Sequence, residues 1–146
     1  MLSEKATIAI KIHFLMFLAE VDMKEPVISE KAPAAIGPYS AALKTGPYVF
    51  VSGQLPVDPQ SGAMPGDIKA QTAMSLSNLK ALLEAAGSSL DKVVKTTVFL
   101  QSMQDFAAMN EVYGSVFPAP YPTRSAVEVA ALPKGALVEI ECIALA

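Results

Sequence analysis

Charged and apolar residues alternate in the two C-terminal segments of the chain, and this pattern constrains the fold more than any other feature. In residues 137–145, Glu139 and Glu141 alternate with hydrocarbon side chains. Residues 124–130 repeat the pattern, and Arg124 stands at their start. Because successive side chains of a β-strand point to opposite faces of its sheet, both segments predict strands with one charged face and one apolar face.

A helix is predicted over residues 67–86, where apolar side chains recur at spacings of three and four. The expected buried stripe consists of Ile68, Thr72, Leu76, Leu79, Leu83 and Ala86. Asp67 lies where a carboxylate suits the helix dipole, and Gly87 is typical of a residue that ends a helix. A second helix is expected from Ser102 to the prolines at 118–122.

The remaining strands are expected at residues 26–30, on both sides of the turn at 45–46, and at 91–101. The order β-β-β-α-β-α-β-β favours an α+β domain, in which two helices pack on one face of a single mixed sheet. The other face would then be bare. Mean hydropathy is +0.40, and a monomer this apolar would expose large patches. We therefore expect oligomerisation through the bare sheet face.

The charge balance bears on the choice of partners. The net charge is −3 and the sequence pI is about 5.1. The sequence contains no run of lysine and arginine and no basic stripe. A basic face supplies most of the affinity of proteins for nucleic acids, so we expect no nucleic-acid partner.

The chain has one cysteine, Cys142, and one histidine, His13. A single cysteine cannot form an intrachain disulfide and suits the reducing cytoplasm, where we expect the protein to act. One chain offers too few soft ligands for a structural zinc site, so no metal is expected. A Cys–His nucleophile pair is not expected either, because His13 lies in an N-terminal segment that differs from the rest.

That segment, residues 1–22, is interpreted as an extension of unknown role that precedes a single domain at 23–146. Its apolar part is shorter than the roughly 18 residues of a membrane span and is interrupted by Lys11, so no membrane association is expected. It lacks the clean apolar core and small-residue cleavage site of a signal peptide. A segment packed on the surface, a targeting signal and an upstream start all stay open.

Arg124 is the candidate binding group that the pattern favours. It follows a proline-rich segment and opens a strand, and a strand end beside a loop is a usual place for a binding residue. A guanidinium there can hold a carboxylate with two parallel hydrogen bonds. The alternative is an ion pair on a solvated sheet face, which is the interpretation preferred for Glu128 and Glu141.

Four further residues are candidates for a cleft. Tyr39 follows a Gly-Pro pair that constrains the backbone, and Ser52 with Gly53 ends a strand where a ligand could approach the main chain closely. Asn110 interrupts the apolar side of the second helix. A packing role is the alternative for each.

Several stretches, taken together and in this order, resemble the reactive-intermediate deaminase family, also called RidA/YjgF. The similarity covers residues 24–145, so residues 1–22 lie outside it. The matching stretches are APAAIGPYSAA, VSGQLPVDPQSG, VVKTTVFLQSMQDFAAMNEVY and YPTRSAVEVAALPKGALVEIE.

The resemblance implies a chorismate-mutase-like α+β fold that assembles as a homotrimer with active clefts between neighbouring subunits. The implied activity is hydrolysis of reactive 2-imino acids, such as 2-iminobutanoate and 2-iminopropanoate, to 2-keto acids and ammonia. No cofactor and no metal are implied. The partners would be the small 2-imino or 2-keto acid and the other subunits.

Residue roles follow from the same resemblance. Arg124 matches the family's substrate-carboxylate arginine, and Glu139 matches its carboxylate near the attacking water. The positions that match the lining of the cleft are Tyr39, Ser52, Gly53 and Asn110. Ala126 stands where some members have cysteine, which affects the expected shape of the pocket more than the expected activity.

Two other functions stay open. The first is a regulatory trimer that binds a 2-keto acid or another small ligand in the same cleft without catalysis; Glu139 argues against it, since a sensor has less need of a carboxylate beside the arginine. The second is RNA cleavage or translational inhibition, which the acidic pI and the missing basic face oppose.

Overall fold

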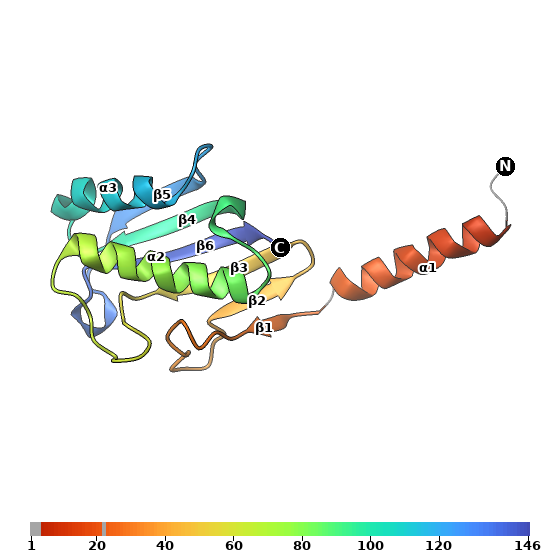
Figure 1. The fold of residues 1–146 in the computed structure, drawn as a ribbon, viewed down its shortest axis with the longest axis horizontal. Coiled ribbons are helices and arrows are strands. Elements are labelled where there is room, and N and C mark those ends of the chain that lie inside the picture. Colours follow the sequence, from red (N-terminus) through yellow and green to blue (C-terminus); the bar gives the residue numbers. More distant parts are fainter. Residues whose placement is uncertain (1–3, 22) are drawn as a thin grey trace.

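The protein is described here by a computed structural model that covers residues 4–21 and 23–146, with a single mixed sheet at its centre (Figure 1). The strands are β1 (Glu25–Val27), β2 (Ala42–Thr45), β3 (Tyr48–Gln54), β4 (Val93–Leu100), β5 (Thr123–Glu128) and β6 (Val138–Leu145). The helices are α1 (Glu4–Val21), α2 (Ile68–Ala85) and α3 (Phe106–Val116), with short 3₁₀ turns at Leu90–Lys92, Met103–Asp105 and Pro133–Gly135. The predicted order of strands and helices from residue 25 onward is confirmed.

The strands lie in the order β1-β2-β3-β6-β4-β5. The neighbours are antiparallel except β4 and β5, which run parallel. A parallel pair needs a crossover connection, and α3 supplies it between β4 and β5. The closing strand β6 is therefore central in the sheet, although it is last in the chain.

The helix α2 forms where the apolar stripe predicts it. The Asp67 carboxylate caps the helix by accepting a hydrogen bond from the Ala70 N–H at 3.0 Å. Gly87, with φ of +78°, ends the helix in the left-handed conformation that favours glycine. Of the predicted stripe, Ile68 is partly buried against the core and the other members are buried: Thr72, Leu76, Leu79, Leu83 and Ala86.

Both α2 and α3 cover one face of the sheet, as the sequence predicts (Figure 1). The start of α3 differs from the expectation. Ser102 caps the short 3₁₀ turn by accepting from the Gln104 N–H at 3.2 Å, and α3 itself begins at Phe106. Met109 and Tyr113 of α3 are buried against the core that α2 shares.

The opposite face of the sheet is open and partly apolar. The large apolar side chains that remain exposed there are Tyr48 (44%), Phe50 (43%), Val127 (43%) and Leu145 (45%). Their neighbours on β3 and β6 are buried on the helix side, for example Val49 between Tyr48 and Phe50 and Ala144 before Leu145. The bare apolar face predicted from the sequence is thus confirmed.

The helix α1 projects from the strand-β1 end of the sheet (Figure 1). Four of its apolar side chains are more than half exposed: Ile8, Ile10, Phe14 and Leu15. Among the helices described, none is both long and apolar enough to cross a membrane.

A buried amide fixes the chain where it leaves β3. The Asn78 side chain, which is 1% exposed, donates from Nδ2 to the carbonyls of Leu55 at 3.0 Å and Val57 at 2.8 Å. Buried backbone carbonyls need such partners. Asn78 therefore ties the helix α2 to the segment that directly follows Gly53 and Gln54.

Replacing Asn78 with alanine would leave both carbonyls without their donor. We expect Asn78→Ala to lower the free energy of unfolding by about 2 kcal/mol, the usual cost of leaving buried polar groups unsatisfied. Urea denaturation at a fixed protein concentration measures this loss. Ser77→Ala, at the exposed neighbouring position, is the matched control, and an equal effect of both substitutions would contradict the role given to Asn78.

Candidate functional site

A β-bulge lies at the middle of the candidate site. Val51 of β3 pairs with Cys142 of β6, but the next pair is Gln54 with Ile140. Ser52 and Gly53 therefore oppose a single residue, and such bulges are frequent next to active sites because they redirect side chains. The sequence indicated the importance of the Ser-Gly pair but not the bulge, because a bulge depends on the partner strand.

Gly53 makes room for the Glu139 carboxylate. A Cβ atom built on Gly53 would overlap Oε1 of Glu139 and lie 2.7 Å from its Cδ. Any other residue at this position would displace the glutamate. The structure thus brings together two of the predicted site residues. It explains the glycine by the close approach of the Glu139 side chain, whereas the sequence suggested the close approach of a ligand to the main chain.

The environment of Glu139 raises the pKa of its carboxyl group above the usual value. The main cause is burial, which disfavours the charged form, and the negative charge of Glu141 on the same face adds to it. A carboxyl group shifted upward can exchange protons closer to neutral pH than an ordinary glutamate. This property suits an acid–base group.

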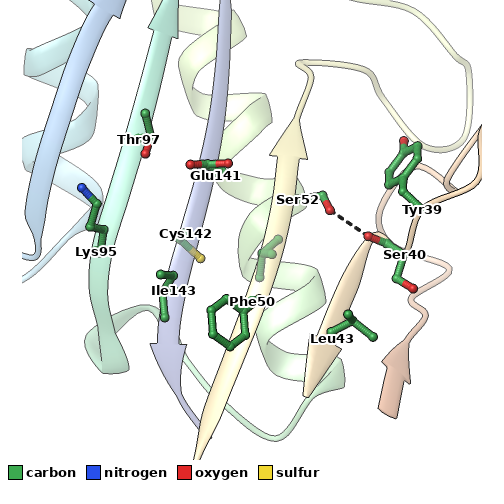
Figure 2. A pocket seen from close by; sticks show the side chains of 11 residues that line it. Tyr39, Ser40, Leu43, Phe50, Ser52, Lys95, Thr97, Glu141, Cys142 and Ile143 are labelled. Carbon is green, nitrogen blue, oxygen red and sulfur yellow. Dashed lines mark hydrogen bonds between the residues drawn. The ribbon is translucent and has the colours of Figure 1, made fainter. Parts of the chain in front are cut away.

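Tyr39 and Ser52 both line a hollow on the open face. The Ser52 hydroxyl donates to the carbonyl of Ser40 at 2.7 Å, and its backbone N–H donates to the carbonyl of Ala41 at 3.0 Å. These bonds hold the loop that carries Tyr39 against β3. Figure 2 shows both residues at the rim of this hollow, which has a volume of about 560 Å³.

The floor of the hollow carries polar residues that the sequence did not single out for a site. Lys95 and Thr97 of β4 lie beside Glu141 of β6, with Phe50 of β3 nearby (Figure 2). The pairing of Thr97 with Glu141 places them on one face. Finding them from the sequence would have required the strand order, since the paired residues Thr97 and Glu141 lie far apart in the chain.

Arg124 lies on the other side of the sheet. It pairs with the fully buried Thr96 of β4 and so faces the helix layer. Its guanidinium carbon lies 4.6 Å from the centre of the Tyr113 ring and 5.6 Å from that of Phe106, both on α3. Within the described part of the chain, Arg124 has no hydrogen bond or ion pair with another side chain. The ion-pair alternative is therefore not supported by the structure of one chain.

Asn110 belongs to the same region as Arg124. It is half-buried, and it stands four residues after Phe106 and three before Tyr113 on α3. Residues at these spacings share one helix face. Asn110 therefore lies on the α3 stripe that faces the arginine, away from the group formed by Tyr39, Ser52, Gly53 and Glu139.

The predicted site residues thus form two groups on opposite faces of the sheet. Arg124 shares its face with Thr96, whereas Glu139 pairs with Phe99 of β4. Thr96 and Phe99 are three positions apart, so their side chains point to opposite faces. One chain alone does not bring the arginine and the glutamate together.

Three other residues have structural roles. Glu128 accepts a hydrogen bond from the Met103 N–H at 2.7 Å, so it joins β5 to the start of the helix layer and is not part of an ion pair among the described residues. Burial, with a smaller contribution from Glu141, raises the pKa of Cys142 to about 12, and the thiol therefore stays protonated. Ala126 is partly buried against the core beside Arg124.

The described residues contain no cluster of three or more ligands for a metal.

Comparison with known proteins gives the family. The model of the family described as Endoribonuclease L-PSP matches residues 29–146. A RutC family protein of Pyrococcus horikoshii is 55% identical over 123 residues, which are 84% of this chain and 98% of the relative. A 2-iminobutanoate/2-iminopropanoate deaminase of Escherichia coli is 47% identical over 126 residues, again 84% of this chain and 98% of the relative.

A solved structure agrees with the sequence comparisons. The crystal structure of E. coli TdcF with bound serine matches with a TM-score of 0.82 and 47% identity, covering 84% of this chain and 99% of TdcF. The chain belongs to the RidA/YjgF family, as its motifs predicted. The family match begins after the helix α1.

The electrostatic coupling of the two glutamates can be tested directly. We expect Glu141→Gln to lower the pKa of Glu139, because the neighbouring negative charge is removed, and to leave it above the ordinary value, because burial remains the larger cause. Carboxyl-carbon NMR titration measures the change. Glu128→Gln removes a charge on the opposite face and serves as control; a Glu139 titration that is insensitive to Glu141→Gln would refute the coupling.

Proposed function

We propose that the protein hydrolyses reactive 2-imino acids, such as 2-iminobutanoate and 2-iminopropanoate, to 2-keto acids and ammonia. The observation that carries the proposal is a pair of complementary groups: an arginine whose N–H groups have no hydrogen-bond or ion-pair partner among the described residues, and a half-buried glutamate with a raised pKa. Relatives that are 47–48% identical over nearly their whole length bear the name of this activity. TdcF, with bound serine, is a related protein that holds a small molecule with a carboxylate and a nitrogen.

We further propose that the active form is a homotrimer of chorismate-mutase-like subunits whose sites lie between neighbours. Two observations support this assembly. Arg124 and Glu139 occupy opposite faces of one sheet, so a second copy is needed to combine them. The open face also exposes Tyr48, Phe50 and Leu145, and subunit contact would cover this apolar area.

In the proposed reaction, Arg124 holds the substrate carboxylate through two parallel hydrogen bonds. Asn110 of the same subunit, and Tyr39 with the Ser52-Gly53 backbone of the neighbour, line the cleft. The imine carbon then lies near the Glu139 carboxylate, with a water molecule between them. Holding these groups in place supplies much of the rate gain in reactions of this kind.

The chemistry requires three proton transfers, starting from the protonated imine. Glu139 accepts a proton as the water oxygen bonds to the iminium carbon, and a neutral tetrahedral carbinolamine forms. Glu139 then returns this proton to the nitrogen. The carbon–nitrogen bond breaks, ammonia leaves, and Glu139 accepts the hydroxyl proton as the keto oxygen forms. A carboxyl group with a raised pKa serves both as acceptor and as donor. No step needs a metal or a cofactor.

A coupled assay tests the activity. A threonine dehydratase generates 2-iminobutanoate, and the protein should speed the appearance of 2-ketobutanoate beyond the rate without it. Arg124→Ala should lower kcat/KM by about 10- to 100-fold, because a hydrogen-bonded charge pair contributes roughly 1.5–3 kcal/mol.

The coupled assay, together with binding measurements, separates this activity from the two alternative functions. Tight binding of 2-ketobutanoate without acceleration would point to the regulatory function, and salt-sensitive binding or cleavage of RNA would point to the activity named in the family description. Full activity of Arg124→Ala would remove the assigned role of the arginine.

The shared site can be tested by complementation. Arg124→Ala and Glu139→Gln should each retain at most about a tenth of the activity, but their co-expression should recover about a quarter of the wild-type activity, because random assembly of equal amounts gives that share of intact interfaces. The two variants purified separately and assayed at once after mixing are the control. If co-expression recovers nothing, the two residues do not act across an interface.

A further inference from the structure

Arg124 is the only arginine in the sequence, and its immediate surroundings are aromatic. Its guanidinium lies over the rings of Tyr113 and Phe106 at 4.6 and 5.6 Å from their centres. Both rings belong to α3, whereas Arg124 belongs to β5. The arginine is therefore held by a different element from the one that carries it.

The Tyr113 ring is itself fixed firmly. Its hydroxyl shares a hydrogen bond of 2.7 Å with the hydroxyl of Thr96, which is fully buried in β4. Its ring packs against that of Phe117, with 4.5 Å between the centres, and the residue is only 4% exposed. The surface beneath the guanidinium is thus part of the core and not a mobile side chain.

The docking of α3 on β5 is also fixed at a second point. The Glu128 carboxylate at the end of β5 accepts from the Met103 N–H at 2.7 Å, directly before α3. At the other end, Thr96 links the two elements, since it pairs with Arg124 and bonds to Tyr113. The strand β5 and the helix α3 therefore cannot shift relative to each other without breaking these contacts.

A guanidinium that stacks on an aromatic ring uses its flat face and leaves its N–H groups free at the edge. The N–H edge of Arg124 has no acceptor among the described residues. A carboxylate needs two of these N–H groups in one plane. The rings therefore restrict the plane of the guanidinium without occupying its donors.

We propose that Phe106 and Tyr113 form an aromatic shelf that orients Arg124 for a substrate carboxylate. They are positioning residues, since they act through the arginine. The inference deepens the proposed function and rests on it for the identity of the ligand. It adds a reason why Arg124 is arginine: a lysine ammonium has no flat face to stack and no planar pair of donors.

Removal of either ring of the shelf should appear in steady-state kinetics as a higher KM. The carboxylate is bound both before and during the reaction, so its loss of orientation weakens uniform binding. We expect Tyr113→Leu and Phe106→Leu each to raise KM about tenfold while kcat changes much less. Tyr113→Phe keeps the ring and should recover most of the binding that Tyr113→Leu loses. Phe14→Leu, on the exposed helix α1, is the matched control.

The single arginine allows a second readout that needs no catalysis. In the wild-type protein, the one Nε–Hε signal of Arg124 in nitrogen–proton NMR should be displaced by the ring currents of the shelf. Tyr113→Leu should move that signal toward the position of a free arginine, and Tyr113→Phe should leave it nearer the wild-type position. If Tyr113→Leu fails to fold, Phe106→Leu at the partly buried position decides the question.

The outcomes are distinct. An unmoved arginine signal and unchanged KM in folded Tyr113→Leu or Phe106→Leu would overturn the shelf. A displaced signal in a wild-type protein that does not accelerate imine hydrolysis would leave the shelf intact and refute the proposed function instead. A proportional loss of kcat with no change in KM would also contradict the shelf, because it would indicate a role in the chemical step.

Discussion

The alternation of side chains along β6 is the constraint on which the candidate site depends. Val138 and Ile140 must face the helix layer, because they complete the core beneath α2 and are fully buried. Glu139 and Glu141 are then forced onto the open face. A one-residue shift in register would place two carboxylates in the core and expose the apolar side chains. The core thus fixes the location of the glutamates.

The same rule places Arg124 on the opposite side, and this separation shapes the proposed mechanism. A carboxylate binder and an acid–base group on different faces of one sheet cannot act on the same small molecule. In the proposed homotrimer, a second copy would cover the apolar open face, which is unfavourable in a lone subunit. Stability and catalysis would then depend on the same subunit contact, and the separate faces would become adjacent walls of one cleft.

Local pattern was sufficient for the parts of the structure that depend on neighbouring residues. The stripe of α2, its cap at Asp67 and the faces of β6 follow from spacings of two to four residues. The strand order, the bulge at Ser52-Gly53 and the aromatic rings beneath Arg124 do not, because each depends on a partner far away in the chain. The resemblance to a known family supplied residue roles, but it gave no physical reason for Gly53.

That reason lies in how closely the Glu139 carboxylate approaches the backbone. Without a side chain on Gly53, the carboxylate lies half-buried against β3, and burial raises its pKa. A fully solvated glutamate would be ionised at neutral pH and a poor donor to a departing nitrogen. A fully buried one would stay protonated and could not accept a proton from water. Glu139, which is partly buried beside the negative charge of Glu141, lies between the fully solvated and the fully buried limit. In the proposed reaction, the bulge and its glycine would therefore act on the chemistry through the degree to which water can reach Glu139.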